Sequence, residues 1–319
     1  MTAGTARRVT APDIAAAKHG DAPLVMVTAY DAPSARSVDG AGVDMILVGD
    51  SLAMVVLGYH DTLQVTTDDM AHHVGAVART QPRALVVADL PWLSYHVSTA
   101  ETVHNAARLI RAGAGAVKLE GGRKRLDAVQ AILDAEIPVM GHIGLTPQSI
   151  HALGGFKVQG KELDAAKALT DDACALADAG VFAIVLECVP DAVARMITES
   201  VPVPTIGIGA GRHCDGQVLV WHDLLGFGGT DRKKPKFVRE YAALEHAATE
   251  AVERFCADVR AGTYPSSAET YHMTDQMAEA FGLYGGTAPE PERLSERKSD
   301  APERLSERTG DEPQREPSQ

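Results

Sequence analysis

The chain has 319 residues, of which 45% are hydrophobic, and carries a formal net charge of −13. This acidity argues against a nucleic-acid partner, because binding a polyanion needs a basic surface. No apolar run approaches the roughly 18 to 20 residues of a membrane span, so we expect no membrane partner. Four widely spaced cysteines without a Cys-x-x-Cys pair indicate a reduced, cytoplasmic protein.

The first 22 residues are expected to form a short helix and a lead-in. Thr10 is a suitable N-cap, Pro12 falls in the first turn, and Gly20 is a suitable stop. Arg7 and Arg8 are not followed by an apolar segment, so no signal peptide is visible.

From residue 23 to residue 265, short apolar runs alternate with helix-length segments. Several of these segments end on a glycine just before the next run (Gly42, Gly113 and Gly180), as helices of αβ units do. Eight such runs favour a closed (β/α)8 barrel over an open doubly wound sheet, which would need a G-x-G-x-x-G motif after its first strand. The predicted strands are Leu24–Thr28, Asp44–Val48, Ala84–Ala88, Ala116–Leu119, Ile137–Met140, Phe182–Leu186, Thr205–Ile208 and Val218–Val220.

Further segments surround this barrel. Apolar residues at helical spacing predict a C-terminal helix over 235–262, whose apolar face packs on the barrel or on a neighbouring subunit. Residues 266–284 form an extension. Residues 285–319 are rich in Pro, Glu, Arg and Ser and contain the heptapeptide Pro-Glu-Arg-Leu-Ser-Glu-Arg two times. This composition predicts a disordered tail. The insertion Gly144–Gly160 is either a mobile lid or a plain surface loop.

Carboxylates follow neighbouring strands at their carboxyl ends, where barrel enzymes carry their active sites. Asp50, Asp89 and Glu120 occupy these positions, and Lys118 shares a strand face with Glu120. Three carboxylates at close range repel one another, and a divalent cation removes this penalty. Oxygen donors favour Mg²⁺ over Zn²⁺. The alternative is that these acids cap helices or pair with arginines.

Other strand ends supply further polar groups. Glu187 lies on the far side of the ring among apolar neighbours, which suits a base that removes a proton from carbon. Lys118 can neutralise a substrate carboxylate or a developing enolate oxygen. His142 can donate a hydrogen bond or shuttle a proton, or it can be structural. The turn Gly207–Gly211 can cradle an anion or serve tight packing at the rim.

Seven motifs in this order resemble those of the ketopantoate hydroxymethyltransferase family. They cover about residues 24–265 and are Thr28-Ala29-Tyr30-Asp31, Val48-Gly49-Asp50-Ser51, Ala88-Asp89-Leu90-Pro91, Val117-Lys118-Leu119-Glu120-Gly121-Gly122, Gly141-His142-Ile143-Gly144-Leu145-Thr146-Pro147-Gln148-Ser149, Leu186-Glu187-Cys188-Val189-Pro190 and Gly207-Ile208-Gly209-Ala210-Gly211.

The resemblance implies a barrel of the phosphoenolpyruvate/pyruvate type, assembled as a homo-oligomer, usually a decamer. It also implies transfer of a hydroxymethyl group from 5,10-methylenetetrahydrofolate to 3-methyl-2-oxobutanoate in pantothenate biosynthesis. By the same resemblance, Asp50, Asp89 and Glu120 would hold one Mg²⁺ per subunit. Ser51 and Lys118 would hold the keto acid, and Glu187 would be the base.

Two other functions stay open at this point. One is a C–C lyase of the same barrel superfamily, although a Lys-Lys-Cys-Gly-His segment, which such lyases share, is missing here. The other is a non-catalytic barrel that binds a metal and carboxylates. Exchange of the substrate's C3 proton would distinguish the enzyme from such a scaffold.

Overall fold

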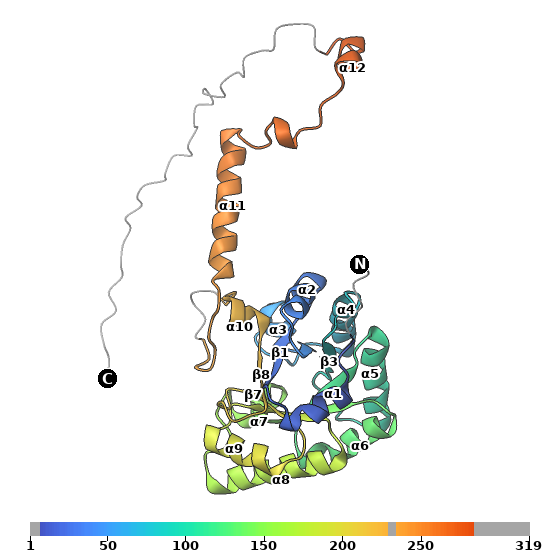
Figure 1. Cartoon of the computed structure of the whole chain (residues 1–319), viewed down its shortest axis with the longest axis vertical. Coiled ribbons are helices and arrows are strands. Elements are labelled where there is room, and N and C mark those ends of the chain that lie inside the picture. The colour runs from blue at the N-terminus through green and yellow to red at the C-terminus, as the bar shows by residue number, and fades with distance from the viewer. Residues whose placement is uncertain (1–6, 229–233, 284–319) are drawn as a thin grey trace, which may run out of the picture. The chain divides into compact units, whose positions relative to one another are not determined.

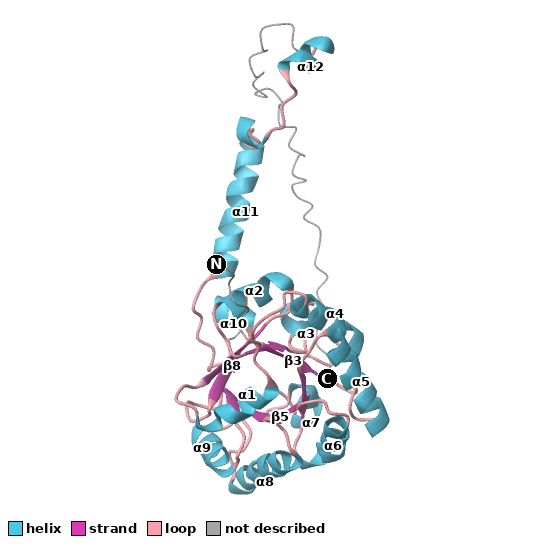
Figure 2. Cartoon of the chain, turned by 45° about the vertical axis from the view of Figure 1, so that its right-hand side comes forward, coloured by secondary structure: helices cyan, strands magenta, loops and turns pink. Residues whose placement is uncertain are grey.

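Eight parallel strands close into a barrel in the order in which they follow along the chain. The computed structural model describes residues 7–228 and 234–283. Figure 2 shows the strands as a ring with helices around its outside. The predicted (β/α)8 barrel is confirmed. The strands are β1 (Leu24–Thr28), β2 (Met45–Val48), β3 (Leu85–Asp89), β4 (Ala116–Glu120), β5 (Val139–Gly144), β6 (Ala183–Glu187), β7 (Thr205–Ile208) and β8 (Gly216–Leu219).

The alternation of side chains along each strand produces two separate buried clusters. Met26, Met45 and Val87 belong to the cluster that fills the barrel. Leu119 and Ile184 belong to the cluster between the strands and the surrounding helices. Because successive strand residues point to opposite faces, a strand covered on both sides reads as a continuous apolar run. For the same reason, a polar residue near a strand end points into the barrel when the residue two positions before it also points inward.

Helices connect consecutive strands from β1 to β7 and form the outer layer (Figures 1 and 2), whereas residues 209–215 join β7 to β8 without a helix. As predicted from the glycine before the next apolar run, α5 ends on Gly113, which is in the left-handed conformation. The connecting helices are α2 (Ala32–Gly40), α3 (Leu52–Val55), α4 (Thr67–Ala78), α5 (Thr99–Ala112), α6 (Leu126–Asp134), α7 (Ile150–Leu153), α8 (Leu163–Ala179) and α9 (Asp191–Ser200), and α10 (Trp221–Leu225) follows β8. Short 3₁₀ turns η2 (Arg123–Arg125) and η3 (Pro147–Ser149) precede α6 and α7.

The N-terminal helix α1 (Ala11–Ala16) and the 3₁₀ turn η1 (Ala17–His19) close the amino end of the barrel. Asp13 accepts a hydrogen bond from the backbone N–H of Thr10 at 2.9 Å, which caps the first turn. Ile14 is 1% exposed and belongs to the cluster inside the barrel. Ile14 therefore seals the floor of the interior core.

The predicted helix over 235–262 is wrong at its start, because α11 runs from Leu244 to Ala261. Residues 235–243 are not helical. Instead, the Tyr241 N–H donates to the Leu224 carbonyl at 2.8 Å, and the Phe237 ring lies against Gly209. No residue of α11 is buried within the chain, so packing of its apolar face on a neighbouring subunit stays a prediction.

The contacts divide the chain into two compact units, one ending at Val252 and the other beginning at Glu253. The second unit contains the end of α11, η4 (Ser267–Glu269) and α12 (Asp275–Ala280). The predicted tail over 285–319 lies outside the described residues. Within the described part, no helix is both long and apolar enough to cross a bilayer.

Candidate active site

The charged residues singled out in the sequence converge at the carboxyl end of the barrel. Four of these residues lie at or near the ends of their strands on the inner face, since each lies two or four positions after an inward apolar residue. They are Asp89, Lys118, Glu120 and Glu187. Asp50 follows β2 in the turn that leads into α3. The structure brings Asp50, Asp89 and Glu120 together, because Asp50 contacts Asp89 directly and Gln148 contacts both Asp50 and Glu120.

Asp50, Asp89 and Lys118 form one contiguous group. The Asp50 N–H donates to Asp89 Oδ2 at 3.1 Å, and Lys118 Nζ lies 2.9 Å from Asp89 Oδ1. All three residues are at most 4% exposed. Gly49 makes the turn possible, because a Cβ at this position would lie 2.9 Å from Ser51 Oγ and 3.4 Å from Asp89 Oδ2. Ser51 Oγ in turn contacts the hydroxyl of Tyr30 at 2.9 Å.

His142 lies between Lys118, Glu120 and Glu187 in the other half of the site. Its Nδ1 lies 3.1 Å from Lys118 Nζ and 3.4 Å from Glu120 Oε1, and its Nε2 lies 3.2 Å from Glu187 Oε2. Burial and the charge of Lys118 lower the pKa of His142, but hydrogen bonding of the ring to the Glu120 and Glu187 carboxylates outweighs them and raises it to about 9. The imidazole therefore links two carboxylates from different strands.

His142 lies beyond the predicted fifth strand, Ile137–Met140, and these predicted bounds are wrong. β5 starts later than predicted and continues to Gly144, so His142 lies within the strand, beside Glu120 of β4 in the sheet register. The extension occurs because residues 141–144 pair with residues 184–187 of β6. Glycine and histidine have low strand propensity, which is why the sequence pattern ended the strand too early.

Glu187 is the most exposed carboxylate of the group, with 16% of its side chain accessible. Its backbone is tightly held, because its carbonyl accepts from the Leu145 N–H at 2.8 Å and Cys188 adopts a left-handed φ of 48°. Gly144 has φ 96°, and a Cβ there would lie 2.3 Å from the Glu187 carbonyl oxygen. Such strain next to a polar side chain is typical of functional sites.

The site carries a surplus of negative charge. Four carboxylates, Asp50, Asp89, Glu120 and Glu187, face one lysine, Lys118, and one histidine, His142. Burial, followed by the charges of Asp89 and Glu120, raises the pKa of Asp50 well above its usual range. Burial lowers the pKa of Lys118, but Asp89, Glu120 and Asp50 together raise it above the usual lysine value. The cluster is therefore suited to receive a further cation.

Sequence reasoning assigned no role to Gln148, Tyr95 or Tyr30, which also belong to the site. Gln148 and Tyr95 contact Glu120, and Tyr30 contacts Ser51. All three are buried. Their only signal in the sequence is that Gln148 and Tyr30 fall within the quoted motifs, since uncharged polar residues outside strands follow no periodicity.

The surroundings of the turn Gly207–Gly211 bear on its two interpretations, an anion site and tight packing at the rim. A Cβ at Gly209 would lie 2.7 Å from the Phe237 ring, and one at Gly211 would lie 2.6 Å from Asp191 Cβ. Both glycines have positive φ. Close packing therefore accounts for these glycines, and an anion is not needed to explain them.

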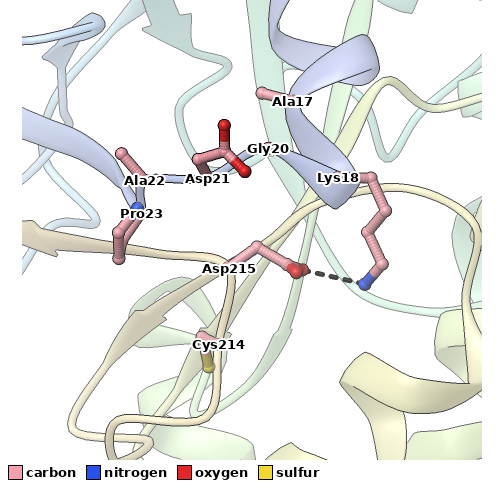
Figure 3. Close-up of a pocket in the computed structure, with 8 residues that line it drawn as sticks. All are labelled: Ala17, Lys18, Gly20, Asp21, Ala22, Pro23, Cys214 and Asp215. Atoms are coloured by element: carbon pink, nitrogen blue, oxygen red, sulfur yellow. Dashed lines mark hydrogen bonds and ion pairs between the residues drawn. The ribbon is translucent and has the colours of Figure 1, made fainter.

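A separate cavity of about 220 Å³ lies at the amino end of the barrel (Figure 3). Its lining comes from η1, the segment before β1 and the segment before β8. Lys18 Nζ and Asp215 Oδ2 pair across it at 2.8 Å. None of the predicted site residues lines this cavity, which belongs to the closure of the barrel floor.

Comparison with solved structures finds other proteins with a similar barrel fold. A phosphoenolpyruvate phosphomutase from Streptomyces platensis subsp. rosaceus has a TM-score of 0.53 and 16% identity, and the match covers 86% of this chain and 96% of that one. A 2,3-dimethylmalate lyase of the PEP mutase/isocitrate lyase superfamily has a TM-score of 0.52 and 18% identity, covering 86% and 97%. These likenesses show the barrel fold.

Sequence comparison gives much closer relatives. A 3-methyl-2-oxobutanoate hydroxymethyltransferase of Syntrophomonas wolfei is 56% identical over 274 residues, which are 85% of this chain and 98% of the relative. The protein of the same name from Moorella thermoacetica is 57% identical over 265 residues, 83% and 98% of the two chains. Residues 8–267 match the family described as ketopantoate hydroxymethyltransferase. The chain therefore belongs to the ketopantoate hydroxymethyltransferase family and is a transferase.

Proposed function

We propose that the chain transfers a hydroxymethyl group from 5,10-methylenetetrahydrofolate to 3-methyl-2-oxobutanoate, with 2-dehydropantoate and tetrahydrofolate as products. The observation that carries this proposal is the buried cluster of four carboxylates around Lys118 and His142, in a chain of this family. The cluster supplies a cation site, a positive group for an acid substrate and a carboxylate that can accept a proton.

Asp50 and Asp89, with Glu120 as a third ligand, would hold one Mg²⁺ per subunit. The donors fit this ion, because they are buried carboxylate oxygens with unbalanced negative charge. Within the described residues, no group of three or more His, Cys, Asp and Glu side chains forms a ready-made metal cage. Mg²⁺ commonly takes one or two carboxylates and completes its shell with substrate and water. When bound, Mg²⁺ acts as a Lewis acid toward the 2-oxo group of the keto acid.

Lys118 and Ser51 would hold the keto acid. The Lys118 ammonium is buried beside Asp89 and can neutralise charge that develops on the substrate. Ser51 lies in the turn after β2, and its hydroxyl is oriented by Tyr30. His142, placed between Lys118 and Glu187, would contact the substrate or relay a proton.

Glu187 would remove the proton from C3 of the keto acid. It is the carboxylate with the greatest exposure in the site and the one farthest along the ring from Asp50, which leaves it accessible to the substrate. The electron pair of the broken C–H bond then forms the new bond to the methylene carbon of the folate, and one C–N bond of that carbon breaks. One water molecule supplies the hydroxyl oxygen as the second C–N bond breaks, and the two folate nitrogens take up the proton from C3 and the remaining proton of the water. The segment Gly144–Gly160 would cover the reactants and exclude bulk water, which limits reprotonation at C3.

The family resemblance implies a homo-oligomer, with a decamer as the expected assembly, and the cysteine content favours a cytoplasmic protein. All four cysteines are free thiols, which suits a reducing compartment. Light scattering of the full chain would test the subunit number.

Product analysis tests this function directly. The protein is incubated with 3-methyl-2-oxobutanoate, 5,10-methylenetetrahydrofolate and Mg²⁺, and 2-dehydropantoate is followed by mass spectrometry. Omission of the folate, omission of the keto acid, and addition of EDTA should each abolish the product. Cleavage of a longer 2-hydroxy acid without folate would identify a lyase instead, and product formation in EDTA would exclude the metal.

A further inference from the structure

Gln148 lies at the centre of the acidic cluster, although it is uncharged. It is 6% exposed and belongs to η3, just after β5. Its backbone N–H donates to Glu120 Oε2 at 3.0 Å, and its Nε2 donates to Asp50 Oδ2 at 2.8 Å. One residue therefore holds an oxygen of two different carboxylates, from the turn after β2 and the end of β4.

The orientation of the Gln148 side chain is determined by its neighbours. The Tyr95 hydroxyl donates to Gln148 Oε1 at 2.6 Å and accepts from the Glu120 N–H at 3.2 Å. The amide Nε2 donates its two hydrogens to Asp50 Oδ2 and to the Leu90 carbonyl at 2.9 Å. If the amide were turned over, its NH₂ would face the hydroxyl and its oxygen would face two acceptors.

A neutral donor has a particular advantage at this position. A lysine or arginine here would orient Asp50 equally well but would cancel the negative charge that attracts a cation. An amide fixes the oxygens while leaving the charge in place. Partners of this kind, which orient metal-binding carboxylates, strongly influence metal affinity.

We propose that Gln148 is a positioning residue that holds the carboxylates of Asp50 and Glu120 for a divalent cation, and that Tyr95 sets the direction of its amide. This proposal rests on the metal site of the proposed function. It assigns to Gln148 no contact with the substrate.

The direct test measures Mn²⁺ binding, with the electron paramagnetic resonance signal of free Mn²⁺ as the readout. Gln148→Met removes the side-chain donors at similar volume, and we expect the dissociation constant to rise by about 10- to 100-fold. Gln130→Met is the matched control, because Gln130 also donates to an aspartate, Asp134 Oδ1 at 2.8 Å, but on the exposed surface of α6. The control should bind Mn²⁺ like the wild type.

Tyr95→Phe provides a second, milder variant. Loss of the orienting hydroxyl should weaken Mn²⁺ binding by about fivefold, the equivalent of one ordinary hydrogen bond. If Tyr95 acts through Gln148, the double variant should bind Mn²⁺ no more weakly than Gln148→Met alone. Should Gln148→Met fail to fold, Tyr95→Phe carries the test by itself.

The outcomes separate this proposal from the proposed function. A folded Gln148→Met variant with an unchanged Mn²⁺ dissociation constant overturns the role of Gln148, even if its thermal stability is lower. An unchanged dissociation constant for Tyr95→Phe overturns the role of Tyr95, and does the same for Gln148 where the first variant does not fold. Absence of Mn²⁺ binding by the wild type overturns both the metal site and the positioning role.

Discussion

The two ends of the barrel each bury a lysine against an aspartate, but in opposite electrostatic settings. At the amino end, Lys18 Nζ donates to Asp215 Oδ2 and to the Thr198 carbonyl at 2.7 Å. Asp215 Oδ2 also accepts from the Thr205 N–H at 2.8 Å. One cation faces one anion there. At the carboxyl end, Lys118 pairs with Asp89, but three further carboxylates and one histidine surround that pair.

The difference is one of charge balance, and the proposed function requires the unbalanced end. A balanced ion pair with matched hydrogen bonds satisfies its own charges and needs nothing from outside. A buried cluster with surplus negative charge costs stability, because each carboxylate raises the energy of the others. Such a cost is expected where a cation and a substrate anion are to be bound, since proteins commonly trade stability for activity at these sites.

Replacement of the lysine at the carboxyl end should have the largest effect on stability. Lys118→Met leaves the buried carboxylates without their main counter-charge, and we expect the free energy of unfolding to fall by about 3 to 5 kcal/mol in the absence of divalent cations. Urea denaturation with EDTA measures this loss. Added Mg²⁺ should restore part of it, because the ion supplies positive charge at the same place. If Mg²⁺ does not reduce the loss of unfolding free energy, the claim that the cluster carries surplus negative charge is contradicted.

The same substitution at the amino end should cost less and should not respond to metal. Lys18→Met removes one charged hydrogen-bonding partner from Asp215, which keeps its contacts with Thr205. We expect the free energy of unfolding to fall by about 2 kcal/mol. The shift on adding Mg²⁺ should equal that of the wild type. A larger loss than for Lys118→Met would reverse the comparison between the two ends.

Removal of one surplus carboxylate should stabilise the metal-free protein. The pKa of Asp50 is raised in the folded state, so the folded protein binds its proton more tightly than the unfolded chain. The free energy of unfolding therefore falls as pH rises from the unfolded pKa through the folded one. The Asp50→Asn variant should lack this contribution to the pH dependence, and its free energy of unfolding should be higher by roughly 1 kcal/mol at neutral pH in EDTA. Unfolding curves across pH measure the difference, and an Asp50→Asn variant less stable than the wild type would oppose it.

Much of this site could be predicted because it follows strand periodicity. Lys118 and Glu120, two positions apart at the end of β4, point into the barrel for the same reason that Leu119 points out. Asp89 and Glu187 follow the same rule on β3 and β6. The barrel itself was predictable from eight alternating units, since each strand is covered on both faces and reads as one apolar run.

What the sequence pattern missed depends on contacts between loops. Gln148 reaches Asp50 only because the chain turns back over the mouth in η3 after β5. Tyr95 reaches Gln148 from the loop after β3. Phe237 fits the helical spacing of α11, yet it lies before that helix and packs against Gly209. Such contacts depend on how two loops that are distant in the sequence are placed in space, and the local periodicity of the sequence does not contain this information.

The central claim is tested most directly by exchange of the C3 proton of 3-methyl-2-oxobutanoate in D₂O, which needs no folate. With Mg²⁺, the wild type should exchange this proton, and Glu187→Gln should lower the rate by about 10²- to 10⁴-fold. Glu162→Gln, an exposed glutamate at the start of α8, should exchange like the wild type. Exchange by Glu187→Gln at the full rate, or exchange that is indifferent to EDTA, would contradict the account.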